Sequence, residues 1–243
     1  MAIAHDLIIR KLLEHSNLGA TELAAIRALP QTERHLIANE DVVLQGDKPE
    51  ESVIVLQGMV ARYHTLRSGR RQYLAFHIPG DMPDSQAIFI DVMDHSVCAL
   101  GDATVALVPH SALVKLFKDC PTFAFAIWRE TLVDAAIFRE AITNNSGRAV
   151  DTRLAHLLCE QYYRARASDL GKPGVSWLPL TQTQLGEALG VSLPSISRAL
   201  RTLRKTGVVD LEGGYLHVHD WAGLCELGEF DPQYLHLSKV KRL

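Results

Sequence analysis

The spacing of apolar and polar residues changes character several times along the chain. Residues 5–38 have the three-to-four-residue apolar spacing of amphipathic helices, and Leu7, Ile8 and Leu12 lie on one stripe. Pro30 follows a second apolar stripe, at a place where proline ends a helix. Residues 5–38 are therefore predicted to be helical.

Between Asn39 and Pro109 the helical spacing gives way to short β-branched runs separated by turn residues. Glycines recur every 11 to 21 residues from Gly46 onward, and Ser68-Gly69 lies between two strand-like runs, as at a hairpin tip. Several short strands with regularly placed glycine turns are typical of an antiparallel sandwich or barrel. This segment therefore predicts a β domain.

Helical spacing returns at residues 111–143. Ser111 can cap a first short helix, which Cys120-Pro121 breaks. Residues 122–142 contain neither glycine nor proline, and an apolar seam follows them at spacings of four, three, three and four residues. Such a narrow seam fits a helix packed on its own domain or a dimer helix, and the dimer is the favoured interpretation. The expected interface consists of Trp128, Leu132, Ala135, Phe138 and Ile142.

The segment from Thr181 onward carries the most informative pattern. Thr181 begins a capping box, because its hydroxyl can reach the Gln184 amide and the Gln184 side chain can reach back. Gly190 can end this short helix in the left-handed conformation, and Ser192 can cap a second helix with Pro194 in its first turn. Two short helices joined by a glycine turn indicate a helix-turn-helix.

The second helix of this motif has one apolar and one basic face when its residues are projected at about 100° each. Ile196, Ala199, Leu200 and Leu203 fall on the apolar face, and the opposite face is basic and rich in hydroxyl groups. A helix of this kind is expected to enter the DNA major groove with its polar face. The residues expected to contact DNA are Thr181, Gln182, Thr183, Ser192, Pro194, Ser195, Ser197, Arg198, Arg201 and Lys205.

Different roles are expected for these residues. Arg198 is the candidate for a bidentate contact to guanine, and Ser195 and Ser197 can contact bases or phosphates. The phosphate backbone is the expected partner of Arg201, Lys205, Thr181 and Thr183, and such contacts add salt-dependent affinity without sequence information.

Residues beyond this motif extend it. Val208–Leu211 and Tyr215–His219 flank Glu212-Gly213-Gly214, a pattern that predicts the hairpin of a winged helix. The charge distribution agrees with DNA binding, because residues 147–243 carry a net charge of +2 in a chain whose net charge is −3.

Composition narrows the protein class further. The chain has 243 residues, of which 47% are hydrophobic, enough to bury a core. Its first apolar run is too short and too broken for a signal peptide, and no stretch approaches the roughly 20 apolar residues of a membrane span. A cytoplasmic protein without a membrane partner is therefore expected. No nucleotide-binding glycine loop, nucleophile elbow or metal-hydrolase helix is present, so an enzyme is not expected.

Nearly the whole chain resembles the Crp/Fnr family of transcription regulators. Residues 43–60 look like the first strands of the family's β-roll, Ile78–Asp81 like the turn before its ligand cassette, and residues 181–209 like its DNA-reading unit. The resemblance implies an α+β protein with a jelly-roll-like β-roll sensor, a long dimerisation helix and a C-terminal winged helix-turn-helix. The implied N-terminal helices and sensor span residues 1–120, and the dimerisation helix and hinge span residues 121–146. The DNA-binding domain spans residues 147–243, and the turn-prone run at residues 144–147 marks its boundary.

The departures from the family pattern concern the effector. Cyclic-AMP-binding members carry Gly-Glu and, about ten residues later, Arg-Ser, where this chain has Asp84-Ser85 and His95-Ser96. A cyclic phosphate would then meet carboxylates in place of a guanidinium. Asp84, Ser85, His95 and Ser96 remain the candidate effector pocket, but cyclic-AMP dependence is not expected.

No cofactor is expected either. The four cysteines lie 22, 39 and 66 residues apart, a spacing that offers no iron–sulfur or metal clip and indicates free thiols. A haem ligated by His77 or His95 and a metal at His217 and His219 are the weaker alternatives. The β-roll can also respond to redox through Cys98 or Cys120, or bind nothing.

The reading helix departs from the family as well. Leu193-Pro194 stands where many members have an Arg-Glu or similar pair, and the lost glutamate removes an acceptor for a cytosine amine. A half-site different from the family's usual one is therefore predicted. The favoured function is a homodimeric, sequence-specific regulator that binds a palindrome on double-stranded DNA, with RNA polymerase as a further partner if it is an activator. The alternative is a sensing module whose DNA binding is conditional or lost.

Overall fold

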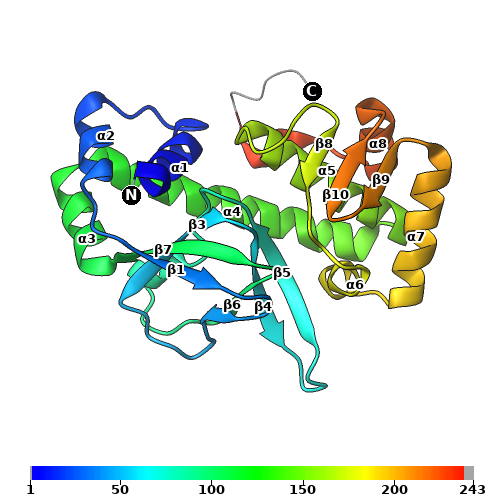
Figure 1. Ribbon diagram of the computed structural model, residues 1–243, viewed down its shortest axis with the longest axis horizontal. Helices are drawn as coiled ribbons and strands as arrows, with labels where there is room; N and C mark the ends of the chain where they lie inside the picture. The colour runs from blue at the N-terminus through cyan, green and yellow to red at the C-terminus, as the bar shows by residue number, and fades with distance from the viewer. Residues whose placement is uncertain (1, 238–243) are drawn as a thin grey trace. The chain divides into compact units, whose positions relative to one another are not determined.

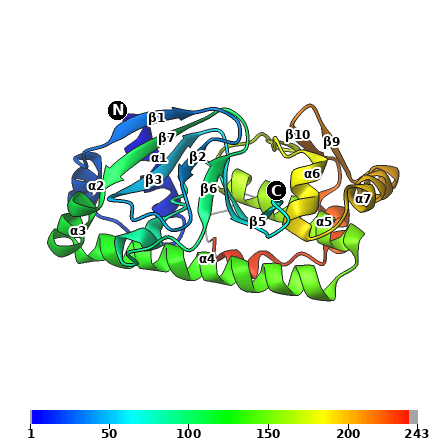
Figure 2. The same ribbon diagram turned by 90° about the horizontal axis from the view of Figure 1, so that it is seen from below.

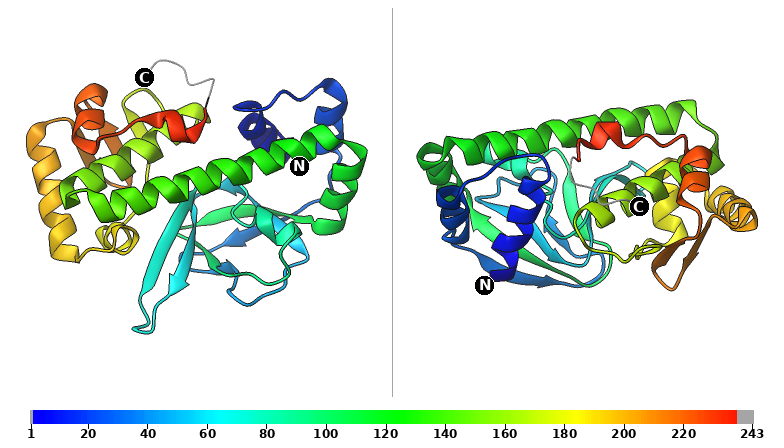
Figure 3. Two further views of the ribbon diagram at one scale, coloured as in Figure 1. Left: turned by 180° about the vertical axis from the view of Figure 1, so that it is seen from behind. Right: turned by 90° about the horizontal axis from the view of Figure 1, so that it is seen from above.

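The computed structural model describes residues 2–237 and divides into two compact units (Figure 1). The first unit comprises the described residues up to Thr65 together with Tyr73–Asp134. The second comprises Leu66–Gln72 and the described residues from Ala135 onward. The helix α4 (Pro121–Gly147) runs from the first unit into the second as one uninterrupted helix (Figure 3).

Two antiparallel sheets make up the β part of the first unit. Their strands are β1 (Thr32–Leu36), β2 (Asp41–Val43), β3 (Glu51–Gln57), β4 (Val60–Thr65), β5 (Arg71–His77), β6 (Ser96–Ala99) and β7 (Ala103–Pro109). One sheet has the order β1-β7-β3 and the other β2-β6-β4-β5. Alternate residues of both sheets, among them Val53, Val60 and Val97, bury their side chains in a common apolar core. The predicted antiparallel β domain is confirmed as a two-sheet roll.

The turn between β4 and β5 is the hairpin tip expected at Ser68-Gly69. The Leu66 N–H donates to the Arg70 carbonyl at 2.9 Å, and the Gly69 N–H donates to the Leu66 carbonyl at 2.8 Å. Gly69 has a φ of 79°, a left-handed conformation that glycine adopts without steric cost.

The helical prediction for residues 5–38 is wrong in its last part. Helices α1 (Ala2–Leu13) and α2 (Ala20–Arg27) form as expected, but Thr32–Leu36 is the strand β1. β1 pairs with β7 from Thr32 opposite Leu107 to Leu36 opposite Ala103. These residues gain a ladder of hydrogen bonds with β7, and a helical spacing rule cannot register a partner strand about 70 residues away.

The helices of the first unit cover one side of this β-roll. α1, α2 and α3 (His110–Asp119) join the start of α4 in a second apolar core, where Ile8, Leu113 and Phe123 pack with Val108 of β7. An ion pair of 3.0 Å between Lys11 Nζ and Asp81 Oδ1 holds α1 to the turn that follows β5.

The polar run Asn144–Gly147 does not break the helix, contrary to the sequence prediction, because its polar side chains find carbonyl acceptors while the backbone stays helical. The Ser146 hydroxyl donates to the Ile142 carbonyl at 2.7 Å, and the Asn144 amide donates to the Arg153 carbonyl at 3.2 Å. The chain turns at Arg148-Ala149 instead, before α5.

The second unit is a helical domain with a small sheet. Its elements are α5 (Val150–Ala167), β8 (Val175–Trp177), α6 (Gln182–Leu189), α7 (Leu193–Thr206), β9 (Val209–Glu212), β10 (Tyr215–Val218), α8 (Trp221–Gly228) and the 3-10 helix η2 (Pro232–Leu235). The sheet has the order β8-β10-β9, and Gly213-Gly214 turns between β9 and β10 with φ angles of 59° and 80°. Figure 2 shows the β9–β10 hairpin beside α6 and α7, which confirms the predicted winged helix.

Candidate nucleic-acid interface

The turn between α6 and α7 is built by local signals of the sequence. Thr181 caps α6 with a complete capping box, in which its hydroxyl accepts from the Gln184 N–H and the Gln184 side chain accepts from the Thr181 N–H. Gly190 ends α6 with a φ of 65°, and Pro194 lies in the first turn of α7. Ser192 occupies the N-cap position of α7, but its hydroxyl pairs with the Ser195 hydroxyl at 2.9 Å.

Helix α7 is anchored by one face and exposed on the other. Ile196, Ala199 and Leu203 are buried, and α7 packs through them on α5 and α6. Arg198 and Arg201 are exposed on the other side, as are the neighbouring positions Pro194 and Lys205. The apolar face thus fixes the orientation of the helix and leaves its basic face available to a ligand.

A groove of about 340 Å³ brings part of the predicted contact set together. It is lined by Thr181 and Gln182 from the start of α6, by Ser197 and Arg201 from α7, and by the wing turn at Gly213. Ser197 donates to the Gln182 side-chain oxygen at 2.6 Å, which joins the two helices across the groove. The backbone N–H groups at the start of α6 and the Arg201 guanidinium are the donor types that bind phosphate.

Another part of the predicted set gathers at the first turns of α7. The Arg198 guanidinium donates to the Ser195 hydroxyl at 3.3 Å, and that hydroxyl is also bonded to Ser192. Ser192, Ser195 and Arg198 therefore form one hydrogen-bonded row near the amino end of α7. Thr183 is exposed on α6 and does not line the groove.

The structure adds a contact that sequence reasoning missed. Arg204 Nε donates to Asp210 Oδ1 at 2.8 Å, and His219 Nε2 lies 3.2 Å from Asp210 Oδ2. The hydrogen bond from Arg204 lowers the pKa of Asp210. This cluster ties the end of α7 to the wing, and His219 is thereby engaged. Within the described residues no group of three His, Cys, Asp or Glu side chains is arranged to hold a metal.

The residues predicted for an effector pocket are buried inside the β-roll. Asp84, Ser85, His95 and Ser96 are all buried, and the Ser96 hydroxyl accepts from the Gln45 N–H at 2.9 Å. His95 shares a hydrogen bond of 2.7 Å with Asp94. Burial lowers the pKa of His95, because the charged imidazolium is poorly solvated there.

Asp84 occupies the most enclosed position of this group. One carboxylate oxygen accepts from the Val53 N–H at 2.8 Å, and the other is buried without a hydrogen-bond partner among the described residues. Burial raises the pKa of Asp84 to about 7. Burial has the opposite effect on His77, a base, and lowers the pKa of His77 to about 4.

A guanidinium does lie in this region, although it comes from β4 and not from the cassette. Arg62 is buried, its Nε donates to the Pro83 carbonyl at 2.5 Å, and its Nη1 is paired with Asp134 of α4. Sequence reasoning missed this residue, for which the one available signal is a charged residue within the apolar run of β4. The buried arginine links the β-roll interior to α4 within the first unit.

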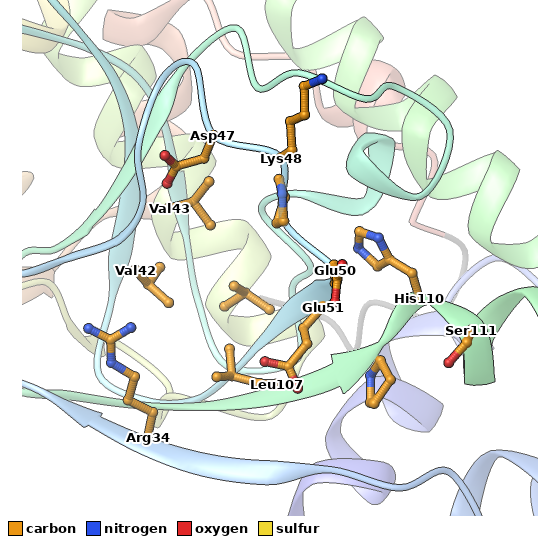
Figure 4. Close-up of a pocket in the computed structure, with 13 residues that line it drawn as sticks. Arg34, Val42, Val43, Asp47, Lys48, Glu50, Glu51, Leu107, His110 and Ser111 are labelled. Carbon is orange, nitrogen blue, oxygen red and sulfur yellow. The ribbon is translucent and has the colours of Figure 1, made fainter.

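A separate cavity of about 900 Å³ opens on the same unit (Figure 4). Its lining is mixed in charge, with Arg34, Glu50, Glu51 and His110 around a floor that includes Val43. None of the four predicted effector residues lines this cavity. The two places on the β-roll are thus different candidate sites.

The predicted dimer seam lies on the face of α4 that the chain itself leaves open. Trp128, Leu132 and Ile142 are 59%, 53% and 69% exposed, and Ala135 and Phe138 are partly buried. The opposite face of α4 is buried through residues such as Ile127 and Val133, so the chain's own core covers that face and not the seam. The described part of the chain contains no helix that is both long and apolar enough to cross a membrane.

Known protein families match both parts of the chain. A model described as a cyclic nucleotide-binding domain matches residues 33–120, and one described as a Crp-like helix-turn-helix domain matches residues 152–227. The anaerobic regulatory protein of Haemophilus influenzae is 26% identical over 224 residues, which cover 91% of this chain and 86% of that protein. The transcriptional activator protein FnrL of Cereibacter sphaeroides is 26% identical over 228 residues, which cover 91% of this chain and 90% of that protein.

Solved structures give the same result. FixK2 from Bradyrhizobium japonicum superposes with a TM-score of 0.73 at 26% identity, over 82% of this chain and 98% of that chain. The two family matches together span more than half of the chain, in the order β-roll and then helix-turn-helix. This chain therefore belongs to the Crp/Fnr family of transcription regulators and carries its helix-turn-helix DNA-binding domain.

Proposed function

We propose that the protein binds a near-palindromic DNA duplex as a homodimer, with α7 of each protomer in the major groove. The observation that carries this proposal is the two-sided helix α7, whose apolar face is buried and whose exposed face presents Arg198, Arg201 and Lys205. Two such helices related by a two-fold axis would read half-sites about 34 Å apart.

The amino end of α7 supplies the sequence reading in this proposal. Arg198 reaches guanine, and the hydroxyls of Ser192 and Ser195 orient its guanidinium. Leu193 and Pro194 are exposed in the same turn and offer apolar contact to a thymine methyl group. The groove between α6, α7 and the wing holds the phosphate backbone through Thr181, Gln182, Ser197 and Arg201, and Thr183 and Lys205 add backbone contacts.

The homodimer forms through the exposed seam of α4. Three large apolar side chains on one face of a 27-residue helix are costly in water, and a second copy covers them with the same face. Partly buried Ala135 and Phe138 continue the seam between the exposed positions.

DNA binding in this proposal does not require cyclic AMP. The Arg62 guanidinium is engaged by Asp134 and the Pro83 carbonyl, and a cyclic phosphate would have to compete with the Asp134 carboxylate for it. Burial disfavours the charged form of His95 and Asp84 adds a second carboxyl group, so the region offers poor complementarity to a phosphate. Asp84, Ser85, His95 and Ser96 are better suited to an uncharged or cationic effector.

The test is a selection from a random duplex pool with purified protein and no added ligand. Enrichment of a palindrome with half-sites one helical turn apart supports the dimeric reader and reveals the half-site, which is expected to differ from the family's usual one. Recovery of a single unpaired half-site contradicts the dimer. Recovery of a site only in the presence of cyclic AMP contradicts ligand-independent binding, and recovery of no site under either condition contradicts sequence-specific reading.

The place of action follows from the DNA partner. We assign the protein to the cytoplasm, without a catalytic role, and RNA polymerase is its further partner if it activates transcription. Transcription in vitro from a promoter that carries the selected site separates activation from repression by the sign of the change in transcript.

A further inference from the structure

Two of the four cysteines meet inside the DNA-binding unit. Cys159 lies on α5 and Cys225 on α8, two helices that pack directly on each other. The Cys159 thiol donates to the carbonyl oxygen of Leu224, the residue before Cys225, at 3.5 Å, and each thiol is close enough to shift the pKa of the other. The two cysteines are 66 positions apart in the sequence, a spacing that does not predict this pairing.

The backbones of the two helices approach closely about one turn from the thiol pair. A methyl group on Gly228 of α8 would lie 2.8 Å from the His156 backbone nitrogen of α5, so only glycine fits there. Gly228 is three positions from Cys225, and His156 is three positions from Cys159. Each cysteine therefore lies one helical turn from this close contact, on the two helices that it joins, and a disulfide requires such closely packed backbones.

The two sulfur atoms are chemically unequal. Cys159 is buried, and burial raises the pKa of its thiol. Cys225 is only partly buried, and the hydrogen bond from Cys159 lowers its pKa. Cys225 is therefore the accessible nucleophile and Cys159 the enclosed partner, the division of roles found in redox-active cysteine pairs.

We propose that Cys159 and Cys225 form a redox-responsive dithiol, which a peroxide converts into a disulfide between α5 and α8. The Cys225 thiolate attacks one peroxide oxygen, the O–O bond breaks, and a sulfenic acid and hydroxide result. The Cys159 sulfur then attacks the sulfenic sulfur, the S–O bond breaks, and the departing hydroxide takes the Cys159 proton as water. In total two thiols lose two electrons and two protons, hydrogen peroxide becomes two waters, and a small-molecule dithiol reverses the bond by exchange.

The cross-link would enclose the whole reading unit. The chain from Cys159 to Cys225 contains α6, α7 and the β9–β10 wing, and α5 is the helix against which α7 packs. A covalent tie between α5 and α8 therefore acts on the support of the reading helix. Cys98 and Cys120 belong to the other unit and serve as internal references.

The experiment uses the full chain, reduced and then exposed to hydrogen peroxide, blocked with N-ethylmaleimide and digested with trypsin without reductant. Cys159 falls in the tryptic peptide of residues 154–164 and Cys225 in that of residues 206–239, so their bond is visible as one joined species. The expected result is this species, lighter by two hydrogens than the two peptides, together with its loss after dithiothreitol. C98S/C120S protein is the matched control and is expected to give the same cross-link.

Three outcomes would overturn the proposal. The first is full labelling of both cysteines with N-ethylmaleimide after peroxide treatment that oxidises other thiols. The second is a cross-link that joins Cys159 or Cys225 to a different cysteine. The third is conversion of Cys225 to sulfinic acid with Cys159 still reduced. All three are read from the wild-type chain, so the conclusion does not depend on a variant that fails to fold.

Discussion

Arg204, in the last turn of α7, donates a hydrogen bond of 2.8 Å to Asp210 at the start of the wing. Because of this pair, α7 carries one cation that is paired within the described part of the protein and others that are not. The charge of Arg204 is neutralised by Asp210, whereas Arg201 and Lys205 form no ion pair with any of the described residues 2–237. Arg201 and Arg204 both line the groove beside the wing, so a comparison of the two isolates the effect of pairing.

The first prediction concerns the salt dependence of DNA binding. Each cation that neutralises a phosphate releases counterions and contributes about −0.9 to the slope of log K against log salt concentration. R201A and K205A should each make that slope shallower by about this amount, measured by fluorescence anisotropy over a salt series. R204A should change it much less, because the paired charge releases few counterions.

D210N provides the reciprocal test. Loss of the Asp210 carboxylate leaves Arg204 with an uncompensated charge, so the slope should become steeper and the affinity for any duplex should rise. Equal slopes for R201A and R204A would show that the ion pair does not persist on DNA.

The second prediction concerns sequence reading by Arg198. R198A should lose about 1–3 kcal/mol of affinity for the selected site and should bind a site changed at the contacted base as well as wild type does. The matched control is K118A, which removes an exposed lysine from α3 in the other unit. A loss for R198A that is the same on every sequence would assign Arg198 to the phosphate backbone.

Local signals made the DNA-reading unit predictable from the sequence. The capping box at Thr181, the left-handed Gly190 and the two faces of α7 depend on residues a few positions apart, and each is present in the structure. The strand alternation and glycine turns of the β-roll are local in the same sense.

Features that depend on distant partners could not be predicted. Thr32–Leu36 becomes a strand because β7 pairs with it, and Arg62 meets Asp134 across 72 positions of sequence. Spacing rules compare residues a few positions apart, so they carry no information about either of these distant partners.

The third prediction concerns the dimer. L132E places a carboxylate in the exposed seam of α4 and, in a two-fold interface, does so twice, so the dimer dissociation constant should rise by at least about tenfold. Sedimentation velocity over a concentration series measures it. L44E is the matched control, because Leu44 is 48% exposed and lies outside α4, and it should leave the dimer intact. Equal weakening by both variants would contradict the α4 interface.

The fourth prediction concerns pH and rests on Asp84, whose pKa burial raises from 3.8 to about 7. Between these two values the folded protein keeps a proton that the unfolded chain has lost, so the Asp84 contribution to the free energy of unfolding falls as pH rises. It is fully present below about pH 4 and is lost by about pH 7, and a shift of this size corresponds to on the order of 4 kcal/mol. His77 acts in the opposite direction, because its lowered pKa makes its contribution grow as pH rises from about 4 to about 6.5.

The variant D84N separates these two groups, because its amide oxygen can still accept the Val53 N–H while the site no longer titrates. Urea unfolding of both proteins at several pH values between about 4.5 and about 7.5 gives the difference in unfolding free energy, from which the shared His77 effect cancels. Wild type should lose stability relative to D84N steadily across this range, since a charged carboxylate with one unpaired oxygen is increasingly costly in the β-roll interior. A difference that does not change with pH would mean that Asp84 is already ionised at about pH 4.5, with a partner for its second oxygen.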